Sequence, residues 1–159
     1  MPDILIAVDP GLACTGLAVF VDGELRSVRG ACTDPTRSLQ QRVISIAEEV
    51  QDAGCCATRC AMEMPTIYPR AKGKGSGNDI VKLATVVGAV IAVLYVSEMM
   101  LVAPAEWKGQ VPKAIHQPRI LAKLRENESR ILRAVSGEYG AKLHNVIDAI
   151  GIGLYALRR

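Results

Sequence analysis

The sequence predicts an α/β fold in which a mixed sheet is flanked by helices. Its first part carries three short apolar segments separated by turns, which is typical of an antiparallel meander. The later segments alternate between strand and helix patterns, which adds strands through helical connections. Half of the 159 residues are hydrophobic, and a chain of this length forms one domain with a full core. We therefore expect a single domain over residues 1–159.

The first two strands are predicted at residues 4–8 and 15–21, which are short apolar runs. Asp9 ends the first run, and Pro10 with Gly11 favours a tight turn before the second. A carboxylate held at the end of a buried strand is costly unless it is paired or binds a metal. The role of Asp9 is therefore the first question that the sequence raises.

A third strand is predicted at residues 24–29, which closes the meander. Asp34 is expected to cap the first helix, with Pro35 in its first turn and Gly54 at its end. A short strand follows at residues 59–62.

The second half of the chain is predicted to add two long helical segments around one more strand. A helix over residues 78–97 is apolar almost all round, so it must be covered on most sides. A strand is expected at residues 99–102, and residues 104–118 read as irregular. A basic amphipathic helix then extends to about Ser136, and a last helix covers residues 142–157.

The composition indicates the class of protein and its cellular environment but not a specific function. The net charge of +3 is compatible with nucleic acid without being diagnostic of it. The apolar stretch 83–96 is shorter than the about 20 residues that a bilayer span needs, and we see no signal peptide. The five cysteines have no zinc-finger or redox spacing. We expect reduced structural thiols in a cytoplasmic protein that does not contact a membrane.

Three acidic residues interrupt apolar segments. Asp9 and Glu63 each follow a short apolar strand, and parallel strands would bring both to the same edge of the sheet. Asp148 lies among apolar residues of the last helix, and His144 shares its face one turn earlier. Gly151 is expected to let that helix lie close to the sheet. These residues predict one site built by distant parts of the chain.

Converging carboxylates repel each other by about 4 kcal/mol per pair at roughly 4 Å and an effective dielectric near 20. A divalent metal cancels this repulsion, and all-oxygen ligands suit Mg²⁺ or Mn²⁺. Each acid also has a structural explanation: Asp9 could begin a turn, and Glu63 could be exposed at a strand end. Asp148 could pair with Arg158 or Lys142.

Four blocks of the sequence resemble RuvC-type Holliday junction resolvases of the RNase H-like superfamily. They are VDPG with TGLAV within residues 8–19, AME at 61–63, HNVIDAIGIGL at 144–154, and APxxWKG at 103–109 followed by Pro112-Lys113. The fourth block has a form found in bacteriophage-encoded members. Lys82 stands where the family has a helix-borne lysine. The resemblance implies an RNase H-like fold with a mixed five-stranded sheet, in a bacterial or phage-infected cell.

The resemblance also implies the chemistry. Asp9, Glu63 and Asp148 would hold two Mg²⁺ ions, with Mn²⁺ able to substitute, and water would cleave the phosphodiester in symmetric paired nicks. The family's fourth ligand falls near Asn145 or His144, of which we favour His144, although this histidine could simply cap the helix. The expected partners are a four-way DNA junction and a second copy of the chain, joined through the long apolar helix, with no nucleotide cofactor.

DNA contacts are expected from a basic loop and from the residues around the tryptophan. The loop would follow phosphates and its tyrosine would stack on a base, although a half-buried aromatic and solvated lysines explain the same residues. The candidates are Tyr68, Arg70, Lys72, Lys74, Lys82, Trp107, Lys108 and Lys113.

Three alternatives remain open at this point. One is another RNase H-like nuclease that cuts branched DNA or processes RNA. Another is a junction-binding protein without catalysis, which retention of all three acids argues against. The third is an actin- or sugar-kinase-like ATPase, whose phosphate loop reads DxGxTG, but those folds duplicate the domain and 159 residues leave no room for a second half.

Overall fold

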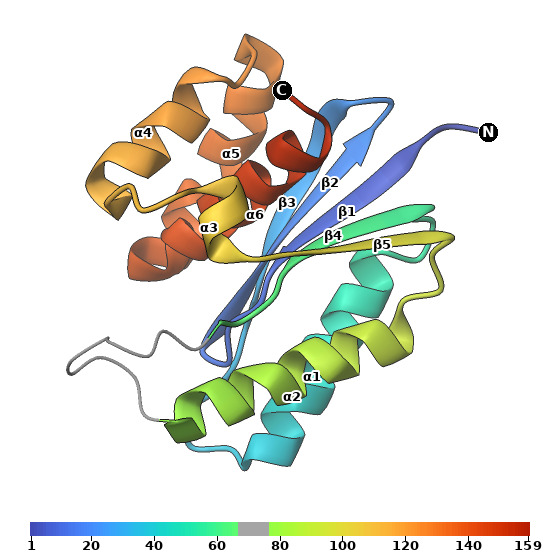
Figure 1. Ribbon diagram of the computed structural model, residues 1–159, viewed down its shortest axis with the longest axis vertical. Coiled ribbons are helices and arrows are strands. Elements are labelled where there is room, and N and C mark those ends of the chain that lie inside the picture. Colours follow the sequence, from blue (N-terminus) through green and yellow to red (C-terminus); the bar gives the residue numbers. More distant parts are fainter. Residues whose placement is uncertain (67–76) are drawn as a thin grey trace.

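The computed structural model describes residues 1–66 and 77–159, which fold around one five-stranded sheet (Figure 1). The strand order is β3-β2-β1-β4-β5, so β1 is central. β1 pairs antiparallel with β2 and parallel with β4, which in turn pairs parallel with β5. The predicted mixed sheet is confirmed. The strands are β1 Ile4–Asp9, β2 Cys14–Val21, β3 Glu24–Cys32, β4 Arg59–Glu63 and β5 Glu98–Val102.

Helices cover both faces of the sheet, as α/β folds require (Figure 1). One face packs against α1 (Leu39–Ala53) and α2 (Gly77–Val93). The other face packs against the C-terminal helices, of which α6 lies directly on the sheet. These are α3 Pro104–Trp107, α4 Lys113–Ala122, α5 Glu126–Tyr139 and α6 Leu143–Ala156, with a 3-10 turn at Gly140–Lys142.

The first helix begins later than the sequence suggested. Asp34 does not cap it, because its carboxylate accepts hydrogen bonds from the N–H and hydroxyl of Thr36 in a local turn. The helix starts after Ser38, which forms a reciprocal capping box with Gln41. Its predicted end at Gly54 is confirmed.

The segment predicted as irregular and then as one basic helix is three helices. Residues 104–107 and 113–122 are helical, so the expectation of irregular chain over 104–118 is wrong. The long helix is interrupted at residues 123–125, because Glu128 turns back to accept the N–H of Arg125 and caps a new helix there. Helix α5 ends at Gly140, where φ is +50°.

Glu128 also joins three parts of the fold. Its fully buried carboxylate accepts the N–H of Leu25 in β3 and both terminal nitrogens of Arg159, which follows α6. The hydrogen bonds from Arg159 lower the pKa of Glu128 to about 2, helped by those from the backbone. These donors compensate the burial of the Glu128 charge. The same hydrogen bonds join α5 and the end of α6 to the sheet.

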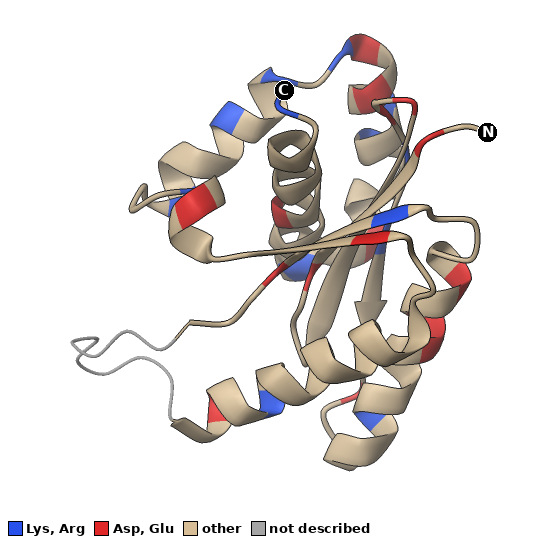
Figure 2. Cartoon of the chain, turned by 45° about the vertical axis from the view of Figure 1, so that its right-hand side comes forward, with Lys and Arg blue, Asp and Glu red and all other residues tan. Residues whose placement is uncertain are grey.

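Among the described residues, helix α2 is covered on one side only. Val86, Val87 and Val90 are buried against the sheet side, whereas Val81 and Ile91 are exposed. Beyond its first turns α2 carries no charged positions (Figure 2). Among the described residues, no helix has both the length and the hydrophobicity that crossing a bilayer requires. The expectation that α2 is covered on most sides is therefore not met by the described residues of a single chain.

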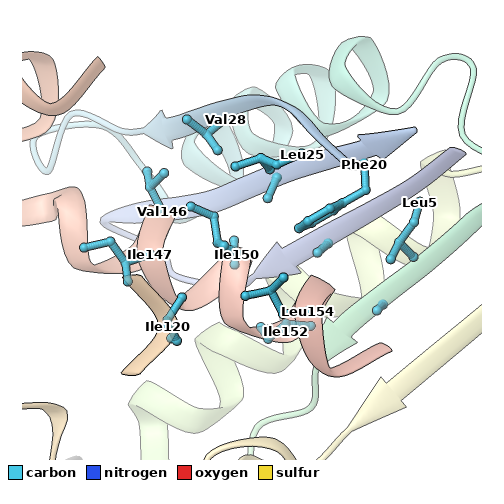
Figure 3. Close-up of a cluster of buried hydrophobic side chains, with 14 of the residues drawn as sticks. Leu5, Phe20, Leu25, Val28, Ile120, Val146, Ile147, Ile150, Ile152 and Leu154 are labelled. Carbon is cyan, nitrogen blue, oxygen red and sulfur yellow. The ribbon is translucent and has the colours of Figure 1, made fainter. Parts of the chain in front are cut away.

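Apolar side chains of α6 and the sheet pack together in one buried cluster (Figure 3), and a glycine of α6 lies tightly against the sheet there. A methyl group placed on Gly153 would lie 2.1 Å from the ring of Phe20 in β2. Gly151, which we expected to serve this purpose, instead faces Trp107 and Ile120 of the neighbouring helices. The close approach was thus correctly predicted, but the wrong glycine was assigned to it.

Side-chain bonds hold the turn that follows β1. The hydroxyl of Thr15 bonds both the N–H and the carbonyl of Gly11. The guanidinium of Arg42 and the hydroxyl of Thr33 both donate to the carbonyl of Leu12. The turn that positions Asp9 is therefore fixed from β2, from α1 and from the residue that follows β3.

Cys14 and Cys32 form a disulfide at the base of this turn. The expectation of reduced thiols is wrong for this pair, because the antiparallel register makes the two residues direct partners on β2 and β3. Cys55, Cys56 and Cys60 are free thiols. Burial raises the pKa of the Cys60 thiol to about 12, so this thiol stays protonated.

Candidate active site

Asp9 and Glu63 lie side by side at one edge of the sheet. Asp9 is the last residue of β1 and Glu63 is the last residue of β4. The two strands are parallel neighbours whose register pairs Val8 with Met62. The next residue on each strand is the acid, so the predicted convergence at one strand edge is confirmed.

The pleat of the sheet points both acids toward α6. Ala7 and Ala61 belong to the core on the α6 side of the sheet. Side chains alternate between faces with a period of two, so Asp9 and Glu63 project from the same face as these alanines. The helix on that face is the one that carries the third acid.

Gly16 allows α6 to reach this edge. It is the partner of Asp9 on β2, and a methyl group placed on it would lie 1.9 Å from the carbonyl oxygen of Asn145. The start of α6 therefore crosses β2 in direct backbone contact. Asp148 follows three residues later on the helix, which brings its carboxylate over the ends of the central strands.

The three carboxylates act on each other electrostatically. Asp9 is 8% exposed, and its pKa is raised well above the ordinary value, first by burial and then by the negative charges of Asp148 and Glu63. The positive charges of Lys108 and Lys113 oppose this rise. Asp148 and Glu63 are therefore close enough to Asp9 to act on its charge, whereas the shared metal site stays a prediction.

Glu63 is held by two donors from the segment after β5. Its Oε2 atom accepts hydrogen bonds from Trp107 Nε1 at 2.7 Å and from Lys108 Nζ at 2.8 Å. The ammonium group also lies 4.7 Å from the centre of the indole ring, a cation–π contact. We expected Trp107 and Lys108 to contact DNA; here they orient an acidic side chain.

Asp148 is held in a similar way from α4. Its Oδ1 accepts a hydrogen bond from Gln117 Nε2 at 3.2 Å, and Gln117 also donates to the carbonyl of His144. Lys113 Nζ lies 3.7 Å from Oδ2. Asp148 itself is 3% exposed. Its pairing with Lys113 differs from the alternatives of Arg158 and Lys142 that the sequence left open.

His144 and Asn145 both border a cavity of about 390 Å³ beside the turn after β1. The Nδ1 atom of His144 lies 2.7 Å from the carbonyl oxygen of Ala141, which leaves Nε2 for another partner. Lys82 borders the same cavity and lies 3.9 Å from a carboxylate oxygen of Asp79. The predicted lysine of α2 is therefore close to the start of α6. Tyr68, Arg70, Lys72 and Lys74 lie outside the described residues.

The donor set fits a hard divalent cation. Among residues 1–66 and 77–159, no hydrogen bond is donated to the Asp9 carboxylate, so a buried acid repelled by two others lacks a neutralising donor. The described residues do not form a ready-made cluster of three metal-binding side chains. Trp107 and Lys108 bind Glu63, and Gln117 and Lys113 contact Asp148. Oxygen ligands of this kind suit Mg²⁺ or Mn²⁺.

Sequence reasoning missed three contributors to this site. Gly16 lies in the TGLAV block, but nothing in a single sequence says that a helix crosses there. Gln117 and His116 lie in a segment that lacked a clear helical pattern. The ring of His116 packs edge-on against Trp107, with 4.8 Å between ring centres.

The fold is that of the RuvC resolvases. The structure of Thermus thermophilus RuvC in complex with a Holliday junction substrate aligns with a TM-score of 0.62 and 20% identity, covering 98% of this chain and 96% of that chain. A second structure of T. thermophilus RuvC aligns with a TM-score of 0.60, at the same identity and coverage. No family model matches the sequence. No curated protein matches it either.

Substitution Gly16→Ala should lower the free energy of unfolding by roughly 1–3 kcal/mol, the usual cost of overpacking. The added methyl group has no space beneath Asn145, so α6 must move away from the sheet. Urea unfolding measures the change. Gly137→Ala is the control, because a methyl group there meets open space in α5 and should stabilise the helix by about 1 kcal/mol. Equal effects of the two substitutions would contradict the close packing.

Substitution Asp9→Asn should stabilise the metal-free chain at neutral pH by about 0.5–2 kcal/mol, a common gain for single substitutions. The folded-state pKa of Asp9 is raised, so ionisation costs stability as the pH rises above its ordinary value of 3.8. The gain should therefore shrink as the pH falls toward that value. Thermal unfolding in a chelator at several pH values tests this.

The matched control is Glu48→Gln, which removes one negative charge from the exposed side of α1. It should change stability little at any pH. A pH-independent gain for Asp9→Asn would show that its charge is not under repulsion.

Proposed function

We propose that the chain is a divalent-metal-dependent endonuclease that resolves four-way DNA junctions by symmetric paired nicks. The observation that carries the proposal is the convergence of Asp9, Glu63 and Asp148 at one edge of a RuvC-type sheet. The similar fold of a RuvC bound to a Holliday junction supports branched DNA as the substrate. At 20% identity the likeness itself concerns the fold, so the proposed activity depends on the acidic site.

The three carboxylates would hold two Mg²⁺ or Mn²⁺ ions, with His144 or Asn145 as a further ligand. Such ions activate a water molecule and stabilise the leaving oxygen of a phosphodiester. The chain's own residues set the geometry: Trp107 orients Glu63, and Gln117 orients Asp148. Hydrolysis by water needs no covalent intermediate with the protein.

The cations around the site suit a polyanionic substrate. Lys108 and Lys113 are bound to the acids in the free chain, and Lys82 lies beside the adjoining cavity. Cations at this edge would neutralise DNA phosphates. The loop residues Tyr68, Arg70, Lys72 and Lys74 belong to the same proposal, since their segment joins Glu63 of β4 to α2.

We further propose a homodimer formed through α2. Small and apolar residues share the uncovered face of this helix, namely Val81, Ala84, Gly88, Ile91 and Ala92, and Tyr95 follows the helix with 90% exposure. An uncovered apolar stripe of this kind suits a second helix. Two-fold symmetry of the dimer would place its two acidic sites at two DNA strands of like polarity in the junction.

The purified chain should cleave a synthetic four-way junction in Mg²⁺ or Mn²⁺. Asp9→Asn should lower the cleavage rate at least about 100-fold. Loss of a residue that supports a metal ligand already lowers activity by up to about 100-fold, and loss of the ligand itself should lower it no less. Gel analysis of labelled strands measures both the rate and the symmetry of the nicks. Glu48→Gln should cleave at the normal rate. Full activity of Asp9→Asn would show that the proposed site is wrong.

The same assay separates the remaining alternatives. Faster cleavage of a fork, a duplex or an RNA–DNA hybrid than of the junction would favour another RNase H-like nuclease. Tight junction binding without cleavage in any of several divalent metals would favour a binding protein without catalysis.

Substitution Ile91→Glu should convert a dimer into a monomer at micromolar concentration, because a charge in an apolar helix contact is left unpaired. Sedimentation velocity measures the mass. Ile115→Glu is the control, since Ile115 is similarly exposed but lies on α4, across the sheet from α2. A monomeric wild-type chain, or a dimer that survives Ile91→Glu, would contradict the proposed interface.

A further inference from the structure

A second cavity, of about 380 Å³, lies between α4 and the end of α6. Its described lining includes no acidic residue and several basic ones, which come from the end of α3, from α4 and the residue after it, and from the C-terminus. The lining cations are Lys108, Arg119, Lys123, Arg158 and Arg159. A cavity of this size holds a small molecule or part of a larger one.

Two of the arginine side chains that line the cavity have no partner among the described residues. Within the described part of the chain, Arg119 and Arg158 have no ion pair or side-chain hydrogen bond, whereas Arg159 is paired with Glu128. Arg158 also has a φ of +56°, a conformation that glycine adopts far more readily than arginine. An arginine therefore stands at a helix end where its backbone is unfavourable and its charge is unpaired.

A buried histidine lines the same cavity. His116 is 9% exposed, and its Nε2 atom is the one buried side-chain nitrogen or oxygen of the described residues without a hydrogen-bond partner. Buried polar atoms almost always have a partner, so an unpartnered nitrogen in one of the residues that line the cavity marks His116 as a candidate donor to a bound group. Arginine and histidine together are donors suited to the oxygens of a phosphoryl group.

We propose that this cavity binds the phosphoryl group of a nucleotide, either free or within a DNA strand, through Arg119, Arg158 and His116. The site is separate from the three carboxylates, and its occupancy does not depend on the proposed cleavage. Trp107 borders the cavity and also donates to Glu63, so the indole lies between the two sites.

The chain supplies its own probe, because Trp107 is its single tryptophan. A deoxynucleoside 5′-monophosphate, titrated in a chelator and without any cleavage reaction, should change tryptophan emission in a saturable way. Arg119→Gln and Arg158→Gln should each weaken binding about ten-fold, as expected for a lost charge-assisted hydrogen bond. Arg133→Gln removes the same charge from α5, where it pairs with Glu126, and should leave binding unchanged.

Further arms identify the source of the phosphoryl group. Binding of an unphosphorylated oligonucleotide that weakens in Arg119→Gln supports a backbone phosphate of DNA, and binding of the monophosphate alone supports a free nucleotide. The proposal is overturned if neither ligand changes the emission, or if a nucleoside without phosphate binds as well. It is also overturned if Lys113→Gln abolishes binding and Arg119→Gln does not, since the phosphate would then lie among the acids.

Discussion

The burial of Asp9 beside two other carboxylates is the constraint that the rest of this structure must offset. Asp9 carries no donor among the described residues, and its pKa is raised by burial and by the two other acids. The opposing contributions are the cations Lys108 and Lys113 and the packing of α6 on the sheet. Active sites are commonly places where such unfavourable arrangements are retained. The apolar contact of α6 with the sheet offsets part of the cost of this arrangement.

Much of the fold could be predicted because its signals are local. Strands ended by acids and a last helix with one acid among apolar residues are visible in the sequence, and parallel pairing follows from the helical connections. The convergence of Asp9 and Glu63 follows from these patterns alone. The resemblance to RuvC-type proteins that the short motifs indicate is confirmed as a likeness of fold.

Features that depend on contacts between distant residues could not be predicted in this way. The Cys14–Cys32 disulfide requires the register of two strands. The break before α5 requires Glu128 to reach back to Arg125. The first helix begins later than predicted because the Asp34 carboxylate bonds Thr36 in a local turn and does not cap the helix. In each case a tertiary or side-chain contact outweighed the local propensity.

The position of α6 in the chain has a consequence for folding. Until this helix docks, the apolar face of the sheet around Phe20 remains in contact with water, and Asp148 is far from the two strand acids. The contact joins residues separated by most of the sequence, which is slow to form compared with local structure. A chain in which α6 has not docked therefore exposes an apolar surface, and its strand acids lack Asp148 beside them. Docking of α6 therefore both completes this part of the core and brings Asp148 to the two strand acids.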